Sequence, residues 1–398
     1  MLSILLTTLQ LITLPSSALA SSQWLVRASD KALLQNISGC QSSVLNPHLG
    51  GDIFKLQCHD PVSLSGLSPV ANVHFEEESS WGIFTPLNLN FIGTSDPLVG
   101  DQWALEQINI ESFWDKQSRG STQTRVAIID TGVDYEHEDL HTQIAVNTNE
   151  IPGNNIDDDN NGYVDDVFGW NAYENTGNAM DFHHHGTHIA GIIAAKPNND
   201  IGVAGMNWNI SLIPIRFIGS NGGGSTEAAI RAFDYAAARG AQIINASWGG
   251  RSNSALLKET IARCRDKGIL LIAAAGNEAV DNDLTPTYPA GFELDNIISV
   301  AAVDLHGDLS TFSNWGKKTV HIAAPGESIL STITGKKYGY SSGTSMATPH
   351  ITGAAALIWS QNPSWTYKEV RDALLQNCIP TPELKDAVQC GGFFQFRN

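Results

Sequence analysis

Apolar residues form short continuous runs in the second part of the chain, and amphipathic segments separate them. Five runs have the length of buried strands: 125–130, 212–218, 241–248, 269–275 and 297–303. Two segments between them carry apolar residues at helical spacing: 226–239 and 255–267. Strands that alternate with helices predict a mainly parallel sheet with helices on both faces. We therefore expect residues 94–398 to form an α/β domain, built as a three-layer sandwich.

Residues 21–93 have a different pattern. Short stretches with the character of half-buried strands occur at 23–28, 52–58 and 71–76, and residues 30–37 have helical character. Residues 79–97 are rich in Ser, Asn, Thr, Gly and Pro, which is typical of a linker. We expect a small α+β domain over residues 21–93, including most of an exposed linker.

The first twenty residues have the features of a secretory signal peptide. Their apolar stretch ends in Ala18-Leu19-Ala20, a small-x-small cleavage pattern. The apolar run is shorter than the ~20 residues that a helix needs to cross a bilayer, which disfavours the alternative of a membrane anchor. One departure is that no Lys or Arg precedes Arg27. We expect residues 1–20 to be removed and the protein to be secreted, either extracellular or periplasmic.

Composition narrows the classes of partner. The chain has 41 acidic and 23 basic residues and a net charge of −18, which argues against nucleic acid and anionic membranes as partners. Cysteines in an exported chain imply disulfides. We expect the local pairs Cys40–Cys58 and Cys378–Cys390, although sequence alone leaves other pairings open. Cys264 lies in an apolar helical segment and is expected to be a buried free thiol.

Four side chains with catalytic potential lie at predicted strand ends or helix starts. Asp130 and Asn277 follow apolar strands, His185 opens an apolar helix, and Ser345 lies where a glycine-rich turn meets a helix. Sites in parallel α/β folds lie at the carboxyl ends of the strands. A serine at a helix N-terminus lies among free N–H groups, which suit a nucleophile whose attack creates an oxyanion. Pro349 is expected in the first turn of that helix.

Each of these residues has an ordinary structural alternative. A serine at a helix start commonly caps the helix, and an aspartate or asparagine after a strand commonly closes a turn. His185 belongs to a group with His183, His184 and His188 that offers metal ligands, but no Glu or Cys completes a familiar ligand spacing. His188 is expected to be packed rather than catalytic. All four structural alternatives would have to be true at once if these residues shared no function. A common functional site is therefore favoured.

The order Asp130, His185, Asn277, Ser345, with the motifs Asp-Thr-Gly, His-Gly-Thr-His and Gly-Thr-Ser-Met-Ala, resembles the subtilisin-like serine proteases, the subtilases. The resemblance covers roughly residues 95–395. It implies that Ser345 is the nucleophile, that His185 takes and returns its proton, and that Asp130 orients His185. Asn277 and the backbone N–H of Ser345 would form the oxyanion hole.

The resemblance also implies a cleft for polypeptide substrates. Gly222, Gly223 and Gly224 resemble the strand that pairs with substrate backbone. The wall of the first specificity pocket is expected to contain Ser247, Trp248 and Gly249. Trp248 departs from the small aliphatic residue typical of this place, so it either narrows the pocket or packs in the core. Glu278 is expected to disfavour acidic side chains at the rim.

A run of acidic residues predicts a calcium site. Its spacing reproduces the start of a calcium loop, with oxygen ligands at positions one, three and five and glycine at six. The expected ligands are Asp157, Asp159, Asn161, Tyr163 and Asp165. The usual glutamate at position twelve is replaced by Phe168, and Asp166 is an alternative ligand. A solvated acidic loop is the competing interpretation.

Resemblance to the subtilases implies a second calcium site. In that family the ion lies between the first residues of the domain, the turn after the catalytic aspartate, and a loop that interrupts the histidine helix. The corresponding residues are Asp96, Asp139, the side chain of Asn199, and the carbonyls of Lys196, Ile201 and Val203.

These expectations combine into a secreted, calcium-stabilised serine endopeptidase that acts as a monomer. The domain at residues 21–93 would be a propeptide that inhibits the enzyme intramolecularly until it is cut between about residues 79 and 96. Two other classes compete: a pseudoprotease that only binds peptides, and a calcium-dependent structural protein. The complete set of four polar residues argues against both, because neither class needs it.

Overall fold

The computed structural model describes residues 22–28, 40–44, 53–58, 73–77 and 94–397. The chain divides into two compact units, Met1–Asn88 and Leu89–Asn398, and each is described by itself. The predicted signal peptide, the predicted helix at 30–37 and most of the predicted linker lie outside the described residues. Within the described residues no helix has both the length and the apolar character that a membrane span requires.

The described part of the N-terminal unit is an antiparallel sheet with strand order β2-β3-β1-β4. Its strands are β1 (Ser22–Ala28), β2 (Cys40–Val44), β3 (Ile53–Cys58) and β4 (Val73–Glu77). The three predicted strands are confirmed, and β2 was missed because its sequence, CQSSV, is largely polar. Cys40 lies opposite Cys58 in the β2–β3 pair. Their disulfide stays a prediction, because their side chains are not described.

Within residues 94–397 the strands form a nine-stranded sheet in the order β14-β15-β11-β10-β9-β8-β5-β7-β6. Neighbours from β15 to β6 are parallel, and β14 is antiparallel to β15. The five predicted strands are confirmed as β5 (Gly120–Asp130), β7 (Asn209–Arg216), β8 (Ile243–Ala246), β9 (Leu270–Ala274) and β10 (Ile297–Val303). The other strands are β6 (Trp170–Asn171), β11 (Ile322–Pro325), β14 (Cys378–Pro380) and β15 (Gly392–Phe394). A separate hairpin consists of β12 (Ile329–Ile333) and β13 (Lys337–Ser341).

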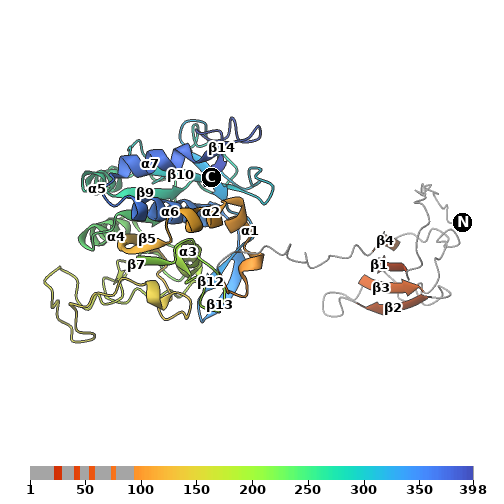
Figure 1. Cartoon of the computed structure of the whole chain (residues 1–398), viewed down its shortest axis with the longest axis horizontal. Coiled ribbons are helices and arrows are strands. Elements are labelled where there is room, and N and C mark those ends of the chain that lie inside the picture. Colours follow the sequence, from red (N-terminus) through yellow and green to blue (C-terminus); the bar gives the residue numbers. More distant parts are fainter. Residues whose placement is uncertain (1–21, 29–39, 45–52, 59–72, 78–93, 398) are drawn as a thin grey trace, which may run out of the picture. The chain divides into compact units, whose positions relative to one another are not determined.

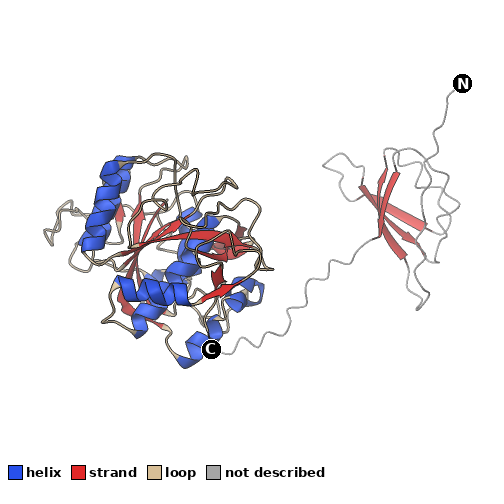
Figure 2. Ribbon diagram, turned by 90° about the horizontal axis from the view of Figure 1, so that it is seen from above, coloured by secondary structure: helices blue, strands red, loops and turns tan. Residues whose placement is uncertain are grey.

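Helices cover both faces of this sheet (Figures 1 and 2). Alternate residues of β5 define the faces: Val126 and Ile128 belong to one hydrophobic core, and Ala127 and Ile129 belong to another. The first core includes residues of α1 (Trp103–Gln107), α2 (Ile110–Lys116), α3 (His185–Ala194), α6 (Thr344–Gln361) and α7 (Tyr367–Gln376). The second includes residues of α4 (Thr226–Ala238) and α5 (Ala255–Asp266). The predicted three-layer α/β sandwich is therefore confirmed.

Helix α6 runs through the first core, where it packs against α3 and several central strands. Residues from Met346 to Trp359 are all buried, and small residues such as Gly353 allow close packing: a Cβ there would lie 2.8 Å from Met206 Sδ. The expectation that Pro349 lies in the first turn is wrong, because α6 begins at Thr344 and Pro349 is its sixth residue. A proline there leaves the carbonyl of Ser345 without its helical N–H donor. Ser247 Oγ donates to that carbonyl instead, at 2.9 Å.

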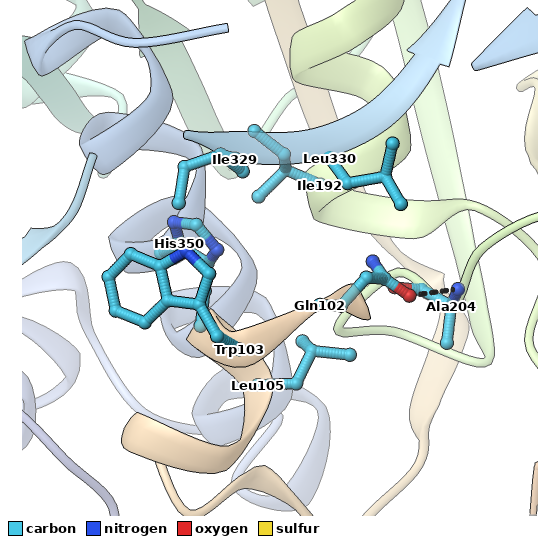
Figure 3. A pocket seen from close by; sticks show the side chains of 9 residues that line it. Gln102, Trp103, Leu105, Ile192, Ala204, Ile329, Leu330 and His350 are labelled. Carbon is cyan, nitrogen blue, oxygen red and sulfur yellow. Dashed lines mark hydrogen bonds between the residues drawn. The ribbon is translucent and has the colours of Figure 1, made fainter. Parts of the chain in front are cut away.

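The start of the larger unit and helix α6 line one small pocket (Figure 3). Trp103 and Leu105 of α1 line it together with His350 of α6. The side-chain amide of Gln102 both accepts from and donates to the backbone of Ala204, at 2.7 and 2.8 Å. The cavity measures about 10 Å³, so it has room for no more than a water molecule.

The cysteines of the larger unit behave as predicted. Cys378 and Cys390 form a disulfide. Cys264 is a buried free thiol on α5, and burial raises the pKa of that thiol to about 12.

Candidate active site

Four elements supply the predicted site residues. Asp130 is the last residue of β5, His185 is the first residue of α3, and Ser345 is the second residue of α6. Asn277 follows β9, close to its carboxyl end. In a parallel sheet these positions share one edge, which is where the fold places a site.

Asp130 and His185 are in direct contact. His185 Nδ1 lies 2.7 Å from Asp130 Oδ1, which also accepts from the backbone N–H of Thr131 at 2.7 Å. Asp130 is fully buried, whereas the His185 side chain is 26% exposed, so the ring stays accessible to a ligand. Burial lowers the pKa of His185, but the charge and hydrogen bond of Asp130 and the charge of Asp181 outweigh burial. The pKa of His185 therefore lies above its ordinary value of 6.5.

Ser345 is held beside Ser247 by a reciprocal pair of hydrogen bonds. Its hydroxyl donates to the carbonyl of Ser247 at 2.9 Å, and Ser247 Oγ donates to the carbonyl of Ser345 at 2.9 Å. Among the described residues no hydrogen bond joins Ser345 Oγ to His185. Hydrogen bonds between a serine and a histidine at such sites are often long or poorly aligned before a substrate is bound.

Asn277 is oriented by the residue that precedes Ser345. Its Oδ1 accepts from the backbone N–H and from the hydroxyl of Thr344, both at 2.8 Å. With Oδ1 engaged, the amide Nδ2 is the end available to a ligand. Gly343 leaves room there, because a Cβ at that position would lie 3.3 Å from Asn277 Nδ2. Asn277 and the start of α6 therefore present amide hydrogens beside the Ser345 hydroxyl.

A pocket of about 190 Å³ opens next to Ser345. Its lining comes from four segments: Trp248, Gly249, Gly250 and Arg251; Ala274, Gly276, Asn277 and Glu278; Thr287; and Thr344 and Ser345. Trp248, Gly249, Asn277, Glu278 and Ser345 were expected here, whereas Arg251 and Thr287 were missed by sequence reasoning. Neither has a motif, and Thr287 enters from a separate loop.

Thr287 lines the buried side of this pocket. Its side chain is 4% exposed, and a Cβ on Gly249 would lie 2.7 Å from Thr287 Cγ2. At the rim, Arg251 lies 3.5 Å from Glu278 and also donates to the carbonyl of Thr285 at 2.7 Å. The guanidinium therefore offsets part of the negative charge that Glu278 brings.

Trp248 satisfies both of its expected alternatives. The indole N–H donates to the carbonyl of Ile129 at 2.9 Å, and the ring packs 4.5 Å from the ring of Phe217. The residue also lines the pocket beside Ser345. Gly222, Gly223 and Gly224 lie in an exposed loop after β7, with Gly224 bridged to Ile218.

The comparisons with known proteins agree with this geometry. A family model described as the subtilase family matches residues 121–391, well over half of the chain. The chain belongs to the subtilase family. Asp130, His185, Asn277, Ser345 and the residues that line the pocket all lie within the matched region.

Among the curated relatives of this subtilase is Subtilisin-like protease 1 of Plasmodium falciparum (isolate 3D7), 35% identical over 73% of this chain and 45% of that protein. Thermophilic serine proteinase of Bacillus sp. (strain AK1) is 38% identical over 70% of this chain and 61% of that protein. The chain thus spans about half the length of the curated relatives it matches. A solved structure described as proteases from Pseudoalteromonas arctica PAMC 21717 aligns with a TM-score of 0.61 and 28% identity, over 76% of this chain and 97% of that one.

The acidic loop of this subtilase brings together a different group of carboxylates from the predicted ligands. Glu150, Asp159 and Asp166 each offer a carboxylate oxygen, and these oxygens lie within 4.8 Å of one another. Of the five expected ligands, only Asp159 belongs to this group. Glu150 was missed because it lies outside the loop spacing. Asp166, named as an alternative, is fully buried and is paired with Arg239 at 3.0 Å.

Three predicted ligands accept hydrogen bonds from the backbone of the loop instead. Asp157 accepts from the backbone N–H groups of Asn161 and Gly162, at 3.0 and 2.8 Å, so its carboxylate closes the turn. Asp165 accepts from two backbone N–H groups on the other side of the loop. Asn161 Oδ1 accepts from the backbone N–H of Tyr163 at 2.8 Å. The calcium-loop motif therefore describes the turn, while the carboxylates that converge come from further apart in the chain.

The residues of the second predicted calcium site lie in contact with one another, and the site itself stays a prediction. Asp96 accepts from the backbone of Asn199 at 3.1 Å, and Asn199 Nδ2 donates to Asp139 Oδ1 at 2.8 Å. Val203 N donates to Asp139 Oδ2, and Lys196 N donates to the carbonyl of Asp139. Ile201 lies in the same loop, and its N–H donates to Asn199 Oδ1 at 2.9 Å. Both carboxylates are buried, and desolvation raises the pKa of Asp139 to about 6.

The histidine group has no metal-ligand geometry. The rings of His183 and His184 stack 4.8 Å apart, beside His185. His188 Nε2 lies 3.0 Å from the carbonyl oxygen of Ile329, and burial lowers the pKa of His188 to about 4. His188 is therefore packed, as predicted.

Proposed function

We propose that this subtilase is a serine endopeptidase that uses Asp130, His185 and Ser345. The observation that carries the proposal is the 2.7 Å contact between His185 Nδ1 and Asp130 Oδ1. A carboxylate that accepts the Nδ1 proton holds the imidazole in the tautomer whose Nε2 can take a proton from a hydroxyl. The raised pKa of His185 suits it to act as a general base, because a general base works best when its pKa lies near the operating pH.

The reaction proceeds through an acyl-enzyme. Ser345 Oγ attacks the carbonyl carbon of the peptide bond while its proton passes to His185 Nε2. The tetrahedral intermediate then collapses, the C–N bond breaks, and the leaving amine takes the proton from His185. Water next attacks the Ser345 ester with His185 again as base, which releases the acid and restores the serine.

Asn277 and the N-terminus of α6 stabilise the oxyanion. Nδ2 of Asn277 and the backbone N–H of Ser345 both donate to the oxygen that becomes negative. Because Thr344 fixes Asn277 Oδ1 with two hydrogen bonds, the donor needs no reorganisation when the charge develops.

The substrate binds as an extended polypeptide. Its backbone pairs with Gly222–224 on one side and with residues 247–249 on the other, which leaves one side chain to enter the pocket next to Ser345. Thr287 closes the base of this pocket, so it favours side chains of small or medium size. Glu278 disfavours acidic side chains, and its pairing with Arg251 moderates the effect.

Calcium binding is part of the proposal. Glu150, Asp159 and Asp166 provide the hard oxygen ligands that calcium prefers, and Arg239 neutralises only one of the three charges. Asp96 and Asp139 offer a second set beside the loop that contains Asn199. These residues fit a cation that stabilises the fold.

We further propose secretion and activation by removal of the N-terminal unit, whose four described strands precede the subtilase domain in the sequence. The enzyme acts as a monomer. Replacement of Ser345 by Ala tests the function: peptide hydrolysis should fall by roughly 10⁶-fold while the fold is retained, and the chain should stay uncut between residues 79 and 96. Hydrolysis within tenfold of the unmodified chain would contradict the assignment.

A further inference from the structure

Asp181 is a buried carboxylate that the proposed mechanism does not use. It lies four residues before His185 and is only 4% exposed. Its Oδ1 accepts from the backbone N–H groups of His183 and His184, at 2.7 and 3.0 Å. Its Oδ2 accepts from the backbone N–H and the hydroxyl of Thr187, at 3.0 and 2.7 Å. Asp181 therefore satisfies one of the free N–H groups in the first turn of α3, that of Thr187, and two N–H groups of the turn before the helix.

This carboxylate is also linked to the end of β5. Thr131, the residue after Asp130, donates its hydroxyl to Asp181 Oδ1 at 2.9 Å. The same hydroxyl accepts from the backbone N–H of Gly186, the residue after His185, at 2.9 Å. One buried hydroxyl thus joins the neighbours of both members of the Asp130–His185 pair.

The start of α3 needs such a restraint. His184 lies at the N-cap with φ of 87°, a backbone conformation unfavourable for a non-glycine residue, and its side chain makes no capping bond. Gly186 packs against the end of β5 so closely that a Cβ would lie 2.0 Å from the carbonyl oxygen of Gly132. A small shift of this turn would therefore move the imidazole away from Asp130.

We propose that Asp181 is a positioning residue for the reaction: through Thr131 and Thr187 it holds the start of α3, and with it the His185 ring, against Asp130. This inference rests on the proposed function of the triad. Five donors face Asp181: three backbone N–H groups and the hydroxyls of Thr131 and Thr187. Both carboxylate oxygens must therefore accept hydrogen bonds. An asparagine of the same shape would turn an N–H₂ group toward donors. A buried carboxylate also forms stronger, charge-assisted hydrogen bonds than an amide.

The negative charge has a second consequence, because Asp181 helps to hold the imidazolium form of His185. The other titratable groups that interact with the ring are Asp130 on β5, His183 and His184 in the preceding turn, and His188 on α3, with His350 of α6 beyond it. Asp130 and Asp181 are the negative members of this set. Removal of the Asp181 charge should therefore lower the pKa of His185.

The test compares Asp181→Asn and Thr131→Val with the unmodified chain, which must first hydrolyse peptide. Asp181→Asn should lower kcat at least tenfold, leave KM within about threefold, and move the acidic limb of the kcat/KM profile to lower pH. Thr131→Val keeps the charge but removes the bridging hydroxyl, so kcat should fall without movement of the limb. Glu174→Gln removes an exposed acid that pairs loosely with Arg216 and should change neither quantity.

Two results would overturn the inference. Asp181→Asn with unchanged kcat and an unmoved acidic limb would show that the carboxylate has no influence on His185. If Asp181→Asn does not fold, as judged by circular dichroism, Thr131→Val decides: unchanged kcat in that variant would show that the link between β5 and α3 does not position the ring. An unmodified chain that is inactive would instead contradict the proposed function itself.

Discussion

Acid should destabilise the subtilase domain through histidines that the fold keeps neutral. Burial lowers the pKa of His188, His321 and His350 to about 4 in each case. An unfolded chain restores the ordinary value of about 6.5. Between pH 6.5 and pH 4 these histidines bind protons in the unfolded state but not in the folded state. The stability present at neutral pH is therefore lost as the pH falls from about 6.5 toward 4.

The size of this effect follows from the two pKa values. At pH 5 each histidine costs about 2 kcal/mol of the free energy of unfolding, or about 6 kcal/mol for the three. Asp139, with its pKa raised to about 6, opposes this by about 1 kcal/mol, and the raised pKa of His185 acts in the same stabilising direction. The net loss of stability at pH 5, after these opposing contributions are subtracted, is comparable to the whole free energy of unfolding of an ordinary domain.

His321 offers the cleanest test, because it lies away from the proposed site. Its Nδ1 accepts from the backbone N–H of Ser299 at 2.9 Å. Urea unfolding of the Ser345→Ala protein, which should not digest itself, would be followed at pH 7 and pH 5 with and without His321→Gln. The substitution should reduce the difference between the two pH values by about 2 kcal/mol. The exposed His306→Gln change is the matched control. An equal pH dependence in the His321 variant and its parent would refute the reasoning.

Three other outcomes are expected. Asn277→Ala should lower kcat by about 10²–10³ with little change in KM, measured with a peptide substrate; a change confined to KM would remove Asn277 from the oxyanion hole. Thr287→Gly should deepen the pocket and raise kcat/KM for aromatic over alanine side chains at least tenfold, and an unaltered preference would place the base of the pocket elsewhere. Chelation should lower the melting temperature of the Ser345→Ala protein, with a loss of about 2.7 kcal/mol from a site that calcium fills at a hundredfold above Kd. Glu150→Gln with Asp159→Asn should reproduce most of that loss at the acidic loop, and identical melts would exclude calcium there.

Local sequence signals were sufficient for the central fold. Buried parallel strands are continuous apolar runs, so β5, β8 and β9 stand out from the sequence, and their ends locate Asp130 and Asn277. The motifs around His185 and Ser345 are also local, because each side chain lies at the start of a helix that the pattern predicts.

The residues that sequence reasoning missed depend on contacts between distant segments. Glu150 joins Asp159 and Asp166 only after the acidic loop folds back, and Thr287 meets Gly249 across the pocket. Asp181 carries no motif of its own, since its partners come from both β5 and α3. Pro349 was misplaced for a related reason: the helix tolerates it in the second turn because Ser247, far away in the sequence, supplies the missing donor.

Covalent labelling by a fluorophosphonate measures the activation of Ser345 most directly, because the reagent reacts with a serine whose base and oxyanion hole are in place. The labelled peptide would be identified by mass spectrometry in the unmodified chain, in Ser345→Ala and in His185→Ala. We expect label on Ser345 in the unmodified chain alone. Absence of label from the folded, unmodified chain, or equal labelling of the Ser345→Ala protein, would contradict the assignment of Ser345 as the nucleophile.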